Sequence, residues 1–91
     1  MKINIEKVVR EFIIRIDGLN FSVKARVSET LTRVDAGKFY WSISHYYSPK
    51  ENGHTQFPGV HTTLTVEDAE TILMTYLKGF TTYGIQCNQD Y

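Results

Sequence analysis

Three histidines and one cysteine are the residues that metal binding or nucleophilic catalysis would use first. They are His45, His54, His61 and Cys87. A metal site needs its ligand atoms to converge within about 2.1 Å of one ion. The register that the turn signals predict places His45 and His61 on opposite faces of a sheet and His54 at a hairpin tip. We therefore expect no metal and no other cofactor.

The chain shows no catalytic constellation. Cys87 lies in the C-terminal tail, with no basic neighbour to favour its thiolate. The acidic residues of the segment 67–70 lie at the predicted start of a helix, where capping and the helix dipole explain them. The sequence contains no G-x-S-x-G, P-loop or G-x-G-x-x-G motif. We therefore expect no enzymatic activity.

Tyrosine, serine and basic side chains gather on one face of the predicted sheet. Tyrosine and arginine are enriched at binding hot spots. The segment 48–59 holds both prolines and is predicted to protrude as a hairpin tip with aromatic flanks. We predict that a partner contacts this face and this tip through Arg15, Lys24, Arg26, Tyr40, Ser44, Tyr46, Tyr47, His54, Phe57 and His61.

Three turn signals set the register of the strands that position these residues. They are Asp17-Gly18, Asp35-Ala36-Gly37 and Asn52-Gly53. Asp-Gly and Asn-Gly favour two-residue type I′ turns, and a three-residue loop ending in glycine favours a left-handed glycine. These turns would pair Phe12 with Val23, Ile14 with Phe21, Val27 with His45, Leu31 with Trp41, Trp41 with Leu64 and Ile43 with Thr62.

Because side chains alternate along a strand, this register collects the large apolar residues on one face. The residues predicted to face a covering helix are Phe12, Ile14, Ile16, Phe21, Val23, Val27, Leu31, Trp41, Ile43 and Leu64. The opposite, open face would carry Glu11, Ile13, Arg15, Lys24, Arg26, Ser28, Tyr40, Ser42, Ser44, Tyr46, His61 and Thr63.

The predicted strands run over 8–16, 19–33, 38–47 and 60–64, although residues 5–12 also fit a short amphipathic helix. A helix should follow Thr65, a good N-cap with Asp68 three residues later, and end near Lys78-Gly79. The sequence thus predicts one α+β domain over residues 1–91, a four-stranded antiparallel meander with one C-terminal helix on one face (ββββα). The tail 85–91 should be flexible or add a short edge strand.

Charge and composition narrow the class of partner and the compartment. The formal net charge is zero, which argues against a dedicated polyanion binder. Residues 1–50 carry nine Lys/Arg and five Asp/Glu, whereas residues 51–91 carry one and five. A single cysteine cannot form an intrachain disulfide, and no apolar run approaches the roughly 20 residues that span a bilayer. We therefore predict a soluble, cytoplasmic protein that does not bind membranes.

No motif in the chain matches a family residue by residue. In size and general build it resembles the small accessory proteins of phages and mobile elements, which often inhibit a host enzyme or defence complex. The leading hypothesis is a small protein-binding module, an inhibitor or adaptor. The alternatives are single-stranded nucleic-acid binding on the Tyr/Arg/Lys face and a structural homodimer subunit.

Overall fold

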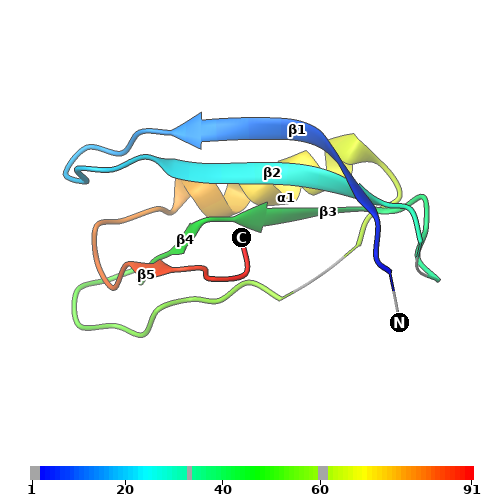
Figure 1. Ribbon diagram of the computed structural model, residues 1–91. Helices are drawn as coiled ribbons and strands as arrows, with labels where there is room; N and C mark the ends of the chain where they lie inside the picture. Colours follow the sequence, from blue (N-terminus) through cyan, green and yellow to red (C-terminus); the bar gives the residue numbers. More distant parts are fainter. Residues whose placement is uncertain (1–2, 33, 60–61) are drawn as a thin grey trace.

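The chain forms a two-layer α+β fold, seen in a computed structural model that describes residues 3–32, 34–59 and 62–91. Its main layer is the antiparallel sheet β1-β2-β3, and a small second sheet pairs β4 with β5. One helix, α1, packs against β2 and β3 behind the main sheet (Figure 1). The elements are β1 (Glu6–Ile14), β2 (Val23–Thr30), β3 (Phe39–Ile43), β4 (His45–Tyr46), α1 (Val66–Lys78) and β5 (Gln86–Cys87).

The core lies between the middle strand and the helix. Val23, Ala25 and Val27 of β2 have no exposed surface, and neither do Ala69 and Leu73 of α1. Alternate residues of β2 point to the same face, while positions four apart on α1 share one side of the helix. The buried face of β2 and the buried side of α1 therefore pack against each other. Three partly buried residues surround this contact, namely Phe12, Ile14 and Trp41.

The helix begins and ends where the sequence predicts. The Thr65 hydroxyl accepts a hydrogen bond from the Asp68 N–H at 3.1 Å, which satisfies one free donor of the first turn. Gly79 closes the helix with φ −90°, and its N–H donates to the Tyr76 carbonyl at 3.3 Å. Glycine is required there for space, because a Cβ atom would lie 2.6 Å from the Tyr47 hydroxyl oxygen.

The predicted strand partners are wrong in both hairpins of the main sheet, but most predicted faces are right. Phe12 lies opposite Ala25 instead of Val23, and Val27 lies opposite Trp41 instead of His45. These displacements are two and four residues. An even displacement leaves each side chain on its original face, because the pleat repeats every two residues.

The displacements arise in the turns. Leu19 N–H donates to the Ile16 carbonyl at 3.1 Å, so a turn does form at Asp17-Gly18. Only Gly18 has positive φ there, whereas a type I′ turn needs positive φ at both central residues. The ladder therefore resumes later, at Val23. In the second hairpin Gly37 has positive φ as predicted, but its N–H bonds to Thr30, which makes a long loop.

A β-bulge changes the faces of the first half of β1. The register shifts between Val8 and Arg10, so Val8 lies opposite Ser28 while Arg10 lies opposite Val27. Val8 consequently shares the open face, and Arg10 shares the helix face, where it pairs with Glu70. The alternative of an N-terminal helix is wrong, since residues 6–14 form a strand.

The predicted fourth strand does not join the main sheet in the described residues. Thr63 makes an isolated bridge to Phe39, and Val60 and His61 lie outside the described residues. The edge expected for residues 60–62 is occupied by the C-terminal segment instead. Asn88 N–H donates to the Ser44 carbonyl, and the Asn88 side-chain amide donates to the Ile43 carbonyl, each at 2.8 Å. The predicted C-terminal edge strand is thereby confirmed as β5.

Three residues predicted for the helix face are exposed, namely Phe21 (39 %), Leu31 (45 %) and Leu64 (77 %). Leu31 and Leu64 lie near the start of α1, which begins only at Val66 and packs on the sheet beyond them. Phe21 precedes β2 and packs its ring on His45, 4.7 Å away. Trp41 is on the predicted face, with its ring 5.4 Å from that of Tyr76.

Adjacent helix residues provide a test of this core. Leu73→Ala removes a fully buried side chain, so we expect the free energy of unfolding to fall by about 2–5 kcal/mol. Ile72→Ala, at a position 41 % exposed, should cost well under half as much. Urea denaturation of both variants measures the difference. Equal losses would contradict this orientation of α1.

Candidate functional site

The face of the main sheet opposite α1 carries three of the ten predicted partner-contacting residues, namely Lys24, Arg26 and Tyr40. Three of its side chains, Ser42, Arg26 and Glu11, stand in a row across the strands, because Arg26 lies opposite both Glu11 and Ser42. In the next row Lys24 lies opposite Ile13. Tyr46, predicted for the same open face, belongs instead to β4, where it lies opposite Gln86.

Arg26 binds the last residue of the chain. Its guanidinium lies over the Tyr91 ring, 4.3 Å from the ring centroid, and donates to the Tyr91 carbonyl oxygen at 2.7 Å. Burial raises the pKa of Tyr91, and the positive charge of Arg26 partly opposes that shift. The open face therefore already holds a peptide segment, recognised through an aromatic ring and a carbonyl oxygen.

The tail that delivers Tyr91 is ordered by its own hydrogen bonds. Asn88 donates two hydrogen bonds, to the carbonyls of Ile43 and Ser44. Its own carbonyl accepts a hydrogen bond from Tyr91 N–H at 3.2 Å, and its side-chain oxygen accepts one from Asp90 N–H at 3.0 Å. Burial, and to a smaller extent the Asp90 carboxylate, raise the pKa of Tyr46. Figure 1 shows this end of the chain beside β3.

A shallow depression of about 270 Å³ adjoins the Arg26–Tyr91 contact. Ile13 is 63 % exposed there, and the Lys24 ammonium makes no hydrogen bond or ion pair to any residue that the structure describes. The depression thus combines an aliphatic side chain, an aromatic wall, two cations and a carboxylate. We call it the Arg26 site; its lining residues are Glu11, Phe12, Ile13, Lys24, Arg26 and Tyr91.

The remaining predicted residues are spread over the molecule. Arg15 and His54 are exposed, and Tyr40 is half-buried on β3. The Ser44 hydroxyl accepts from Lys24 N–H at 2.8 Å and shares a hydrogen bond with His45 Nδ1. His61 lies outside the described residues.

Tyr47 is buried, so its side chain is not available to a partner. Its hydroxyl donates to the Tyr76 carbonyl at 2.8 Å, and its ring packs on those of Tyr76 and Phe80. The predicted alternation puts Tyr47 on the helix face, because Tyr46 is predicted for the open face; Tyr47 was predicted as a contact residue only because it flanks the tip. Tyr91 was missed because nothing local to the tail indicates where it folds back.

The hairpin tip at 48–59 is tied to the segment before β5. Thr55 hydroxyl donates to the Gly84 carbonyl at 2.6 Å, and Thr81 hydroxyl donates to the Ser48 carbonyl. The turn itself spans Lys50 to Gly53, with a hydrogen bond of 3.1 Å, one residue earlier than predicted. Phe57 remains exposed while its ring meets that of Tyr46 edge-on at 5.0 Å. The tip is therefore a braced loop with one exposed aromatic side chain.

His45 and Cys87 lie opposite each other in the β4–β5 pair, a neighbourhood that the sequence did not reveal. Cys87 is exposed and free. Across residues 3–32, 34–59 and 62–91, no three His, Cys, Asp or Glu side chains come together in a way that could hold a metal ion.

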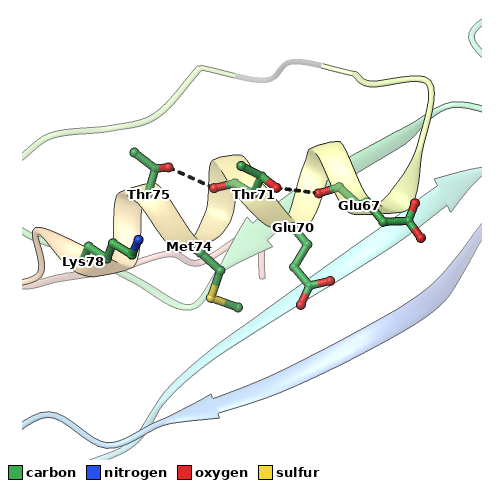
Figure 2. Close-up of a pocket in the computed structure, with 6 residues that line it drawn as sticks. All are labelled: Glu67, Glu70, Thr71, Met74, Thr75 and Lys78. Atoms are coloured by element: carbon green, nitrogen blue, oxygen red, sulfur yellow. Dashed lines mark hydrogen bonds between the residues drawn. The ribbon is translucent and has the colours of Figure 1, made fainter.

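Another depression, of about 450 Å³, runs along one side of α1 (Figure 2). Glu70 and Met74 point from the helix toward the sheet, and Arg10 of β1 pairs with Glu70 and, at 3.8 Å, with Glu67. The hydroxyls of Thr71 and Thr75 donate to helix carbonyls four residues earlier. These groups are thus already paired within the chain, apart from Lys78 at the far end.

We expect Tyr91→Ala to release the tail from Arg26. Loss of the ring contact should lower the free energy of unfolding by about 0.5–1 kcal/mol. The heteronuclear ¹⁵N NOE of Asp90 should fall toward values typical of a mobile segment. Tyr83→Ala, which truncates an exposed ring, serves as the control. An unchanged NOE at Asp90 would show that the stack does not hold the tail.

Burial raises the pKa of Tyr76 to about 12, and its hydroxyl donates to the Gln56 carbonyl at 3.0 Å. A folded-state pKa above the unfolded value of 10.0 means that this tyrosine stabilises the fold below pH 10 and loses that contribution as pH rises toward 12. Tyr76→Phe should therefore show a smaller fall in stability over that range than the wild type. In an absorbance titration of tyrosinate formation, the Tyr76→Phe variant should also lack the step at highest pH. The control Tyr83→Phe should retain that step.

None of the helices in the described part of the chain has the length and apolar character needed to cross a bilayer. Comparison of the chain with models of known protein families, with curated proteins and with solved structures gave no match. The function must therefore be argued from the geometry of the surface itself.

Proposed function

We propose that this chain is a protein-binding module, an inhibitor or adaptor, that contacts its partner through the Arg26 site. One observation supports this most. The open face already holds a peptide segment of the chain itself, through the ring and carbonyl oxygen of Tyr91 on Arg26. An exposed aliphatic residue, Ile13, lies next to that contact, as does the Lys24 ammonium, which pairs with none of the described residues.

The shape and charge of the site favour a protein surface over a small ligand. The depression measures about 270 Å³, which is below the roughly 300–1,000 Å³ of typical small-molecule sites. Aromatic, aliphatic and arginine groups in one patch are the composition of an interface centre.

A single-stranded nucleic acid is the weaker alternative. Stacking of bases requires free aromatic faces beside cations. At the Arg26 site the Tyr91 ring is already stacked on Arg26, and Glu11 places a carboxylate at the edge where phosphates would pass. These contacts favour a polypeptide partner.

Substitution of Lys24 tests the proposal. Lys24→Glu reverses an exposed charge at the Arg26 site, and Lys50→Glu makes the same change on the exposed tip as a matched control. We expect a partner captured from the source cell by the full chain, and then purified, to bind the Lys24→Glu variant about thirtyfold more weakly and the control normally. Isothermal titration calorimetry measures both.

Equal affinity of the partner for Lys24→Glu and the wild type would contradict the proposal. Salt-sensitive binding of a single-stranded oligonucleotide, lost in Lys24→Glu but kept in Lys50→Glu, would instead establish the nucleic-acid alternative.

A further inference from the structure

β1 is an edge strand with an uncovered outer side. In the described part of the chain it pairs with β2 alone, and α1 packs on β2 and β3. Six of its nine residues are exposed. An edge strand presents unpaired N–H and C=O groups and can act as a template for another strand.

The bulge confines this template to the second half of β1. Regular pairing cannot continue across the register shift between Val8 and Arg10. Arg10 is also held on the helix face by Glu70 and Glu67. The segment available for regular pairing is therefore 11–15, which reads Glu-Phe-Ile-Ile-Arg.

The backbone of this segment points its free groups outward at alternate residues. Lys24 directs its main chain toward β3, since its carbonyl accepts from Ser44 N–H at 2.8 Å. Because these directions alternate along a strand, the N–H and C=O groups of Val23 and Ala25 point toward β1. There the two residues lie opposite Ile14 and Phe12. The N–H and C=O groups of Ile13 and Glu11 consequently point away from β2.

The same segment is complementary in charge to itself. If two copies align antiparallel with Ile13 opposite Ile13, Glu11 of each copy faces Arg15 of the other, and Phe12 faces Ile14. Displacing the register by one or two residues leaves both charges without an opposite partner. Arg15 and Ile13 are exposed, and Arg15 has no ion pair or hydrogen bond from its side chain to any described residue.

We propose that two copies of this chain pair through their β1 strands, antiparallel about a twofold axis at Ile13, to form one six-stranded sheet. Such an interface uses the same surface patch on both copies, as closed twofold symmetry requires. It places both helices on one side of the joined sheet and both open faces on the other. The pairing is independent of whether the Arg26 site binds a partner.

Charge variants of the full chain test the pairing through its symmetry. Glu11→Arg and Arg15→Glu each place like charges opposite one another, so each should raise the dimer dissociation constant by about tenfold or more. An equimolar mixture of the two variants should form a heterodimer, because every pair is again opposite in sign. The double variant Glu11→Arg/Arg15→Glu should regain the wild-type constant, and Glu51→Lys on the exposed tip should leave it unchanged.

Sedimentation equilibrium and native mass spectrometry measure these states, and circular dichroism confirms that each variant is folded. Dimerisation that is insensitive to these changes, or a mixture that stays monomeric, would overturn the proposal. So would a wild-type chain that remains monomeric at about 1 mM, a concentration that half-saturates even a very weak association.

Hydrogen exchange of the wild type alone provides a second test that needs no variant. Pairing predicts that the Ile13 amide exchanges more slowly as chain concentration rises. A dimer formed by packing open faces together would instead protect the Arg26 site side chains and leave this amide's exchange independent of concentration. That result would reject the edge pairing even if the chain dimerises.

Discussion

The contact between the middle strand and the helix is the constraint on which the rest of the structure depends. Val23, Ala25 and Val27 of β2 are fully covered where they meet Ala69 and Leu73 of α1. The helix lies mainly over β2 and β3, and it meets β1 at its margin through the Arg10–Glu70 pair. In the described part of the chain β1 pairs with β2 alone, so it forms the free edge of the sheet.

Among the described residues no helix lies on the opposite face of the sheet, and the segment that ends at Tyr91 covers part of that face. Asn88 attaches the tail to the carbonyls of Ile43 and Ser44, which brings Tyr91 onto Arg26. The stack removes apolar surface of the Tyr91 ring from water, and the Arg26 guanidinium still donates a hydrogen bond to the main chain of Tyr91. The segment from Asn88 to Tyr91 thus covers part of the sheet face with four residues.

Two surfaces thus follow from one packing arrangement. The Arg26 site lies on the uncovered face, and the free edge of β1 lies beside it, with Glu11 and Ile13 common to both. Ile13 points its side chain to the open face and its backbone to the free edge. A second copy at the free edge and a partner on the open face would accordingly contact adjoining parts of one continuous surface.

By itself, the sequence determined the helix, the order of the three main strands and the face of most core residues. Thr65, Asp68 and Lys78-Gly79 delimit the helix by local hydrogen bonding, and turn errors of two and four residues left the alternation of side chains intact. Only the tertiary structure decided the bulge at Val8, the place of the C-terminal tail beside β3 and β4, and the contact of Tyr91 with Arg26. The physical reason is range: caps and turns depend on neighbours in the chain, whereas Arg26 and Tyr91 are 65 residues apart and meet only after the sheet has formed.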